Sequence, residues 1–310
     1  MHAFRKQHLY LVPFILIAVT VAIYSFPLLI SFGQELIAKQ GLELTPPSQE
    51  VSAKPGQKVK FAVKIRNPFS NSVPVKIRVE DFTASGDEGQ IALTKDDDYS
   101  VIGWAQVEPS SFTLKAGGEQ TVSVSLSVPQ SAAGGRYGAL VFSVAPNIEN
   151  QKGSVTAVSQ EIASLFLLKI DGPANENLTL ESIKAPSFSE FGPIPMSMTF
   201  RNTGNIHTKT AGLINVTDMF GNKVQDVVVK PTNVFPGATR VITTNLNKRF
   251  LFGFYTITAA MYYGKENHVL NASSRFFVMP IRLIGIVVIV LAIIYAGRKR
   301  IRKAGKALFG

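Results

Sequence analysis

The sequence predicts an all-β region of two tandem immunoglobulin-like β-sandwiches, flanked by an N-terminal signal or anchor helix and a C-terminal transmembrane helix. Three observations predict this fold class. Apolar and polar residues alternate with period two in many short stretches between 42 and 278, as in half-buried strands. The order of strands and turns repeats in two stretches of roughly 100 residues, the usual size of such a sandwich. An uncharged run lies near each end.

The N-terminal run, Leu9–Phe32, contains no charged residue and is long enough to cross ~30 Å of hydrocarbon as a helix. Two interpretations of residues 1–33 remain open. A signal peptide ends in a small-x-small cleavage site, which Ser31–Gly33 provides, and Pro27 can end the helix before it. The length of the run favours an uncleaved signal anchor instead. Both interpretations predict that the chain after residue 33 is exported.

The second run, Leu283–Gly297, is followed by six cations between Arg298 and Lys306. Fifteen residues rise only ~22 Å in a helix, so the preceding residues must be included, which predicts a transmembrane helix at 280–297. A basic stretch directly after such a helix is typical of a cytoplasmic tail, here 298–310. The sequence therefore predicts a cell-membrane protein with residues 34–280 outside the cytoplasm.

The net charge of +11 belongs to the ends of the chain. Nine of the 32 cations and none of the 21 anions lie outside residues 34–281, which leaves 23 cations against 21 anions between them. This balance gives no sign of a nucleic-acid surface, so no nucleic-acid partner is expected. The chain has no cysteine, so an exported region must be stabilised by its core without disulfides.

Strand patterns are clear in the first half of the chain. Lys58–Asn67 and Val73–Phe82 both alternate apolar and polar residues, and Val122–Val128 alternates with serine until Pro129 ends the pattern. Val155–Ile170 is a further strand prediction. Ser159–Phe166 within it also fits a short helix, but the β-branched flanks favour a strand.

The second half repeats this order. Asp171–Pro173 interrupts the pattern and divides the chain into two predicted domains, 41–172 and 173–279. Ile194–Asn202 alternates as Lys58–Asn67 does, and both stretches end in Arg-Asn. A Gly-containing turn, a strand and a Gly-x-Tyr sequence then follow in each half. The matching order predicts two sandwiches of one type.

The first half also shows a family resemblance. "PGQKVKFAVKIRN" and, after a single Trp, "FTLKAGGEQTVSVSLSVPQSAAGGRYGALVF" resemble the WxL-interacting proteins of Gram-positive cell surfaces. This resemblance implies an export signal, two Ig-like domains, one C-terminal membrane span and a basic tail. It further implies peptidoglycan binding by the first domain, 41–172, and protein binding by the second. The resemblance carries over no binding-residue motif, so the ligand-binding residues stay unknown.

Three residues or pairs could contact a ligand or have a structural role. Trp104 is a stacking platform for a sugar or, more commonly in sandwiches, a core residue between sheets. Tyr137 and Tyr255 occupy matching positions, which favours a structural role such as a tyrosine corner. Arg136 is a turn cation that fits an acidic ligand or a solvated side chain, and the solvated side chain is favoured.

Asp96–Asp98, with Asp87 and Glu88 upstream, form an acidic stretch. Clustered carboxylates hold Ca²⁺, but the spacing of a calcium loop is absent, so a solvated loop is favoured. Whether Asp96–Asp98 bind calcium stays open.

No catalytic, cofactor-binding or metal-binding residue is predicted. The four histidines are not near a nucleophile motif, and phosphate-binding glycine loops and zinc motifs are absent from the sequence. The histidines are His2, His8, His207 and His268. Glycosylation sequons at Asn177, Asn215 and Asn271 matter only where the source modifies such sites.

The sequence therefore predicts a non-enzymatic, membrane-anchored surface protein that binds cell wall, with peptidoglycan as a partner, or other envelope proteins. The alternative is a scaffold or accessory subunit of a membrane or secretion complex. A third class, an enzyme with an unrecognised pair of carboxylates, has no motif to support it.

Overall fold

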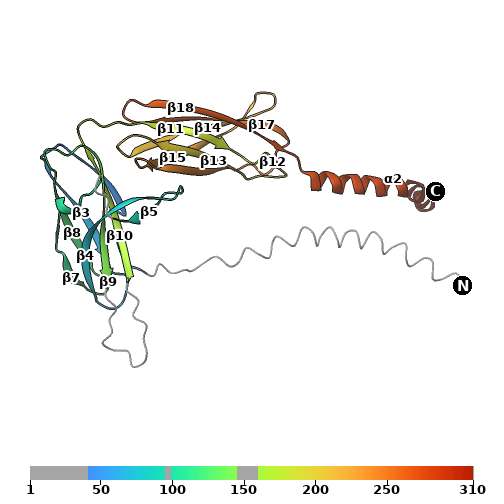
Figure 1. The fold of residues 1–310 in the computed structure, drawn as a ribbon. Coiled ribbons are helices and arrows are strands. Elements are labelled where there is room, and N and C mark those ends of the chain that lie inside the picture. Colours follow the sequence, from blue (N-terminus) through green and yellow to red (C-terminus); the bar gives the residue numbers. More distant parts are fainter. Residues whose placement is uncertain (1–40, 95–98, 145–159, 310) are drawn as a thin grey trace. The chain divides into compact units, whose positions relative to one another are not determined.

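The computed structural model describes residues 41–94, 99–144 and 160–309, and the side chains of the last helix as far as Arg298 (Figure 1). By their contacts, residues 42–310 belong to one unit. The predicted signal or anchor segment 1–33, the acidic residues Asp96–Asp98 and the first residues of the Val155–Ile170 prediction lie outside the described residues.

The strands before residue 171 form two sheets. The first sheet has the order β1-β3-β8-β6, with β1 (Glu43–Thr45), β3 (Lys58–Arg66), β8 (Glu119–Ser127) and β6 (Ala105–Glu108). The second has the order β2-β10-β9-β4-β5, with β2 (Ser48–Ala53), β10 (Gln160–Ile170), β9 (Gly134–Val144), β4 (Val73–Ser85) and β5 (Gln90–Leu93). The short strand β7 (Ser111–Leu114) also pairs with β4. These strands confirm the strand prediction over 160–170 against the helical alternative.

Period-two alternation places the core between these sheets. Val122, Val124 and Leu126 of β8 are fully buried, while their neighbours along the strand face outward. The central strand β9 is buried on both faces, because Leu140 and Phe142 join the core between the sheets while Ala139 and Val141 join a second apolar cluster. A strand that is buried on both faces has a continuous apolar sequence, as in "YGALVF" at 137–142.

The strands after residue 177 form two more sheets. One has the order β11-β13-β16, with β11 (Leu178–Lys184), β13 (Ile194–Asn202) and β16 (Thr239–Leu246). The other has the order β12-β18-β17-β14-β15, with β12 (Phe188–Ser189), β18 (His268–Val278), β17 (Gly253–Tyr263), β14 (Thr208–Asp218) and β15 (Lys223–Val234). Their shared core contains Met196, Met198 and Phe200 from one sheet and Ile257 and Ala259 from the other. The described part of the chain is thus nearly all β-structure arranged in sandwich-like pairs of sheets.

The repeated Arg-Asn sequence has a structural role in both halves. Asn67 is fully buried, and its Nδ2 donates to the carbonyls of Asn71, Leu114 and Lys115 while its Oδ1 accepts the Phe69 N–H. Asn202 is equally buried; its Nδ2 donates to the carbonyls of Ile206 and Val234, and its Oδ1 accepts the Gly204 N–H. Each asparagine therefore satisfies backbone groups of the turn that follows its strand and of a second segment distant in sequence.

Strands β1 and β2 cover the edges of both sheets of the first pair. β1 pairs antiparallel with β3 at Lys64–Arg66, and the chain then crosses to the other sheet, where β2 runs parallel to β10. The β2 pairing covers only Leu165–Ile170. The first half of β10, Gln160–Ser164, is therefore left at the edge of its sheet.

Helix α2 (Ile281–Phe309) follows the last strand. It continues through the predicted tail 298–310 to Phe309, instead of ending with the predicted span 280–297. Its first 18 residues, Ile281–Arg298, have a mean hydropathy of 2.2 and are not buried against the described part of the chain. By length and composition this helix is able to cross a membrane, a property that by itself assigns no location.

Candidate functional site

Trp104 and Arg136 lie together at the margin of the first core. Trp104 ends a short 3-10 helix, η2 (Ile102–Trp104), and is only partly buried, instead of being enclosed between the sheets. The Arg136 guanidinium carbon lies 5.5 Å from the centroid of the Trp104 ring. Arg136 Nη1 also donates to the carbonyls of Ala133 and Gly135. The prediction of a solvated Arg136 is wrong, because its guanidinium lies over the Trp104 ring and donates hydrogen bonds to the backbone of its own turn.

Tyr137 and Tyr255 have structural roles, as their matching positions predict. The hydroxyl of Tyr255 donates to the Phe252 carbonyl at 3.1 Å and accepts the Phe252 N–H at 2.9 Å. The hydroxyl of Tyr137 accepts the backbone N–H of His207 at 2.7 Å. Burial raises the pKa of Tyr137 and lowers the pKa of His207 to about 4, so both side chains are neutral near pH 7.

The remaining titratable candidates do not assemble into a catalytic or metal site. His268 lies in β18, with Nε2 3.5 Å from the carboxylate of Glu266. Asp87 and Glu88 lie in the turn between β4 and β5. Among the residues that the structure describes, no group of three or more His, Asp or Glu is placed to hold a metal ion.

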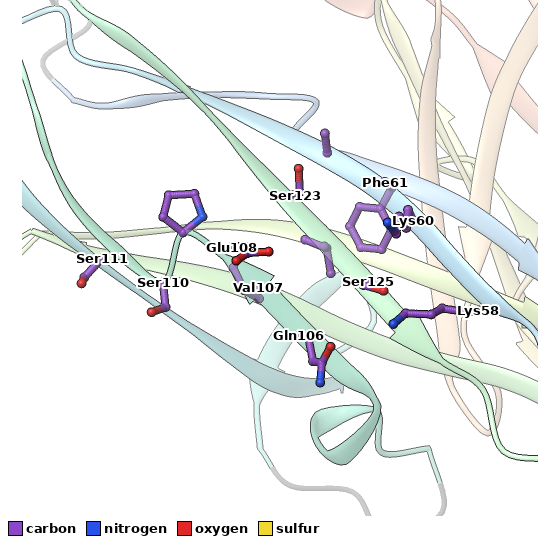
Figure 2. Close-up of a pocket in the computed structure, with 13 residues that line it drawn as sticks. Lys58, Lys60, Phe61, Gln106, Val107, Glu108, Ser110, Ser111, Ser123 and Ser125 are labelled. Atoms are coloured by element: carbon purple, nitrogen blue, oxygen red, sulfur yellow. The ribbon is translucent and has the colours of Figure 1, made fainter.

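A groove of about 990 Å³ lies over the outward face of the sheet β1-β3-β8-β6 (Figure 2). Two cross-strand rows form its floor: Lys60, Ser125 and Gln106 lie side by side, and Ala62, Ser123 and Glu108 form the next row. The serines lie on β8, between the lysines of β3 and the long side chains of Gln106 and Glu108 on β6. The groove is hollow because serine and alanine leave room between lysine on one side and the β6–β7 turn on the other.

The side chains of this groove suit binding better than catalysis. Lys58, Lys60 and Glu108 take part in no ion pair with another described residue, and the Ser125 hydroxyl is shielded from solvent without a hydrogen-bond partner. Most of the lining residues are polar, but they do not include a histidine or cysteine to activate a nucleophile. Sequence reasoning missed this groove, because only the sheet register places Ser123 and Ser125 between those lysines and Glu108.

The second candidate is the open edge of β10. The Leu165 N–H donates to the Pro47 carbonyl, and the Asp171 N–H to the Ala53 carbonyl, so odd-numbered residues of β10 direct their backbone groups to the β2 side. Backbone direction alternates along a strand, so Glu161 and Ala163 also present N–H and C=O groups on this side. No described strand pairs with them there. An unpaired edge of this kind is a template for another strand.

Side chains give this edge an apolar and a polar side. Ile162 and Leu44 are partly buried and pack against the core of the first pair of sheets. On the outward side, Arg78 of β4 donates two hydrogen bonds to the Glu161 carboxylate, which also accepts the Ser143 hydroxyl. The pKa of Glu161 is lowered to about 2, chiefly by the Arg78 hydrogen bonds. A strand added here meets an apolar surface on one side. On the other side it meets the charge of Glu161 and, next to it, the partly buried Ala163.

The comparisons with known proteins bear on the fold. No family model matches the chain, and no curated protein matches it. Among solved structures, the class 5 fimbriae chaperone CfaA matches at 14% identity and a TM-score of 0.39, over 76% of this chain and 99% of that chain. The SafA pilin in complex with the SafB chaperone from Salmonella enterica matches at 15% identity and a TM-score of 0.35, over 77% and 98%. The periplasmic chaperone SfaE matches at 13% identity and a TM-score of 0.33, over 77% and 100%.

At these values the likeness concerns the fold alone, an immunoglobulin-like sandwich that these chaperones share. The resemblance to the WxL-interacting proteins is nevertheless wrong, because the matching structures are fimbrial chaperones and no family model supports that assignment. The motifs that carried the resemblance describe strands and turns, which unrelated sandwiches of this type also contain. The matching structures are of chaperones, not of enzymes.

Three further predictions are corrected with it. The prediction of a membrane-anchored protein that binds cell wall is wrong, since the matching structures are of chaperones. The prediction of peptidoglycan, membrane and surface proteins as partners is also wrong, since the matching complexes contain a tip adhesin or a pilin. The predicted membrane location, with residues 34–280 outside, is also corrected: SfaE is described as periplasmic, and one apolar helix is weak evidence for an anchor.

Proposed function

We propose that this chain is a non-enzymatic accessory protein of a secretion or assembly system, which holds an extended segment of a partner protein along the open edge of β10. The observation that carries the proposal is a pair of backbone positions beside the end of β2, Glu161 and Ala163, with which no described strand pairs on that side. Peptide recognition by strand addition uses such groups: main-chain hydrogen bonds supply affinity, and alternate side chains supply specificity.

The kind of partner follows from the two sides of this edge. Side chains of an added strand that point inward meet Ile162 and Leu44, so they are apolar. Side chains that point outward meet the Glu161 carboxylate, which Arg78 holds, and then the partly buried Ala163, so we expect a polar residue followed by a small or apolar one. A protein subunit that exposes an alternating strand before assembly fits both requirements. Two of the matching structures are complexes, of SafB with a pilin and of CsuC with a tip adhesion subunit.

The domain boundaries belong to the same proposal. We propose 41–172 and 173–279 as two Ig-like domains, supported by their separate cores and by the matching roles of Asn67 and Asn202. The open edge of β10 lies in the first of these domains.

Site-specific photo-cross-linking in the source cells tests the proposal. A photoreactive residue at Ala163 is expected to give one discrete protein adduct, identified by mass spectrometry. The same residue at Lys169, whose edge β2 covers, serves as the matched control. Adducts of equal yield at both positions, or at neither, would contradict the proposal.

A proline variant tests the hydrogen bonds themselves. Ala163→Pro removes an N–H that points away from β9, so it breaks no bond of the sheet but prevents pairing along the edge. We expect it to abolish partner capture in pull-downs of the tagged full chain, with an unchanged circular dichroism spectrum. Ala163→Ser keeps the N–H and should retain capture.

A further inference from the structure

An apolar patch lies on the outward face of the five-stranded sheet, far along the chain from the β10 edge. It consists of Leu213, Val228, Ala260, Tyr262 and Val269, from the neighbouring strands β14, β15, β17 and β18. Their exposed fractions are large: 45% for Leu213, 69% for Val228, 49% for Tyr262 and 64% for Val269. Figure 1 shows these four strands side by side in the C-terminal half of the chain.

The strand register makes the patch continuous. Val228 pairs with Leu213, and Leu213 pairs with Ala260, so three apolar side chains form one row across the sheet. Tyr262 pairs with Val269 in the next row. The row on the other side is polar, with Asp226, Asn215, Thr258 and Ser273. The solvent-exposed face of a sheet normally carries polar residues. Two adjacent apolar rows with a polar row beside them therefore indicate an interaction surface.

The charges around the patch select its partner. On the β15 side, Lys230 follows Val228 on the same face, and Asp226 precedes it. On the β18 side, Arg275 lies beyond Val269, and Glu266 lies in the turn before β18. Lys230 and Arg275 take part in no ion pair with another described residue. Lys230 and Asp226 on one side, and Glu266 and Arg275 on the other, therefore follow in opposite order along the strands. Asp226 also forms an ion pair with Lys223, and Glu266 lies 3.5 Å from His268 Nε2.

We propose that this patch binds the same patch of a second copy of the chain, with the two sheets face to face about a two-fold axis parallel to the strands. Rotation about that axis places β15 of one copy over β18 of the other at the same height. Lys230 then approaches Glu266 of the second copy, and Asp226 approaches Arg275. In a two-fold interface the same surface of both copies meets, so the surface must be complementary to itself. The two pairs of opposite charge give this complementarity.

The direction of the axis follows from these charges. With the axis parallel to the strands, Leu213 of one copy lies over Ala260 of the other, and Val228 lies over Asn271, which ends the same row. An axis across the strands would place β15 over β15 and would keep Lys230 away from Glu266. Sheets that stack with aligned strands are a common packing.

Chemical cross-linking tests this geometry, because the natural chain has no cysteine and single-cysteine variants are specific. Stacked sheets lie ~10 Å apart, which exceeds the reach of a disulfide, so a short bis-maleimide is the appropriate reagent. The full chain is kept in a mild non-ionic detergent, since helix α2 exposes apolar side chains. Leu213→Cys is mixed with a size-tagged Ala260→Cys chain, and Ile102→Cys mixed with Ala260→Cys is the control.

We expect the Leu213–Ala260 mixture to give a covalent heterodimer in at least ~10-fold greater yield than the control, the equivalent of ~1.4 kcal/mol of preferential encounter. Val228→Cys mixed with Asn271→Cys is expected to behave in the same way. Association through helix α2 would give equal yields in all mixtures and would overturn the proposal. A chain that sediments as a monomer at tens of micromolar would do so as well, and would leave the patch to another protein.

Charge exchange provides an independent readout. Lys230→Glu brings two glutamates together across the proposed interface, and Glu266→Lys brings two lysines together. Each is expected to weaken association roughly two- to fivefold in sedimentation equilibrium, as exposed pairs do. The double variant restores the pair and the association. If each single variant matches the natural chain, or the double variant equals the sum of the single effects, the proposed register is wrong.

Discussion

The guanidinium of Arg78 and the carboxylate of Glu161 are joined by two hydrogen bonds, 2.8 Å and 2.9 Å long, which link β4 to β10 across the intervening strand β9. Ser143 of β9 lies between them, and its hydroxyl donates to Glu161 at 2.8 Å. Three neighbouring strands are thus tied together on the outward face. This connection holds the first half of β10 in the sheet at the place where β2 no longer covers its edge.

The pH dependence of this pair can be measured. The pKa of Glu161 is lowered to about 2 in the folded chain, below its ordinary value of 4.5, so the unfolded chain binds the proton more readily. The contribution of the pair to stability is therefore complete above pH 4.5 and is lost as the pH falls toward 2. We expect the melting temperatures of the natural chain and of Glu161→Gln to differ at pH 7 and to converge near pH 2. Curves that stay parallel throughout this range would contradict the assignment.

The lowered pKa of His207 predicts that the free energy of unfolding changes in a different pH range. Burial lowers its pKa to about 4, from 6.5 in an unfolded chain. The unfolded chain therefore binds an additional proton between these values, and stability is expected to fall by roughly 3 kcal/mol as the pH decreases from 6.5 to 4. Urea denaturation of the natural chain should show this slope. His207→Gln should lack it, while the exposed His268→Gln should retain it, and equal slopes in the two variants would show that another group is responsible.

The buried asparagines are expected to be among the most sensitive polar positions. Asn67→Ala leaves the carbonyls of Asn71, Leu114 and Lys115 without their donor, and Asn202→Ala does the same to Ile206 and Val234. Each substitution should cost about 2–4 kcal/mol of unfolding free energy, because buried carbonyls lose their partners. Thermal denaturation checks this, with the exposed Asn71→Ala as the control. Melting temperatures that match the control would remove the structural role assigned to the Arg-Asn repeat.

Val124 tests the assignment of strand faces. It is fully buried in β8, and its neighbour Ser123 faces the groove. Val124→Asp buries an unpaired carboxylate at a cost of several kcal/mol, which should unfold the first pair of sheets. Ser123→Asp adds the same charge on the outward face and should leave the melting temperature within a few degrees of the natural chain. The reverse order of the two variants in circular dichroism melts would show that the faces are exchanged.

Local patterns determined most of the secondary structure. The alternation in Lys58–Asn67 and Ile194–Asn202 predicted strands that the structure confirms as β3 and β13, and it predicted which side chains are buried. The matching Arg-Asn ends and Gly-x-Tyr openings predicted repeated turns, and Tyr255 and Asn202 confirm that these residues stabilise them. The bonds of Tyr255 to Phe252 and of Asn202 to Gly204 join neighbours within a few residues, so the sequence alone contains this information. The bonds of Tyr137 to His207 and of Asn202 to Val234 join distant segments, and only the tertiary structure shows them.

The candidate sites depend on tertiary structure. The open edge at Glu161 and Ala163 exists because β2 pairs with β10 only from Leu165 onward, and no local pattern states where a pairing strand ends. The groove and the apolar patch arise from lateral neighbours, such as Ser125 beside Lys60 and Leu213 beside Val228, that are distant in sequence. Arg136 was expected in solvent for the same reason, since the chain between it and Trp104 gives no sign that they meet. Strand order and register are set by long-range packing of the core, and these surfaces are created only when that packing is complete.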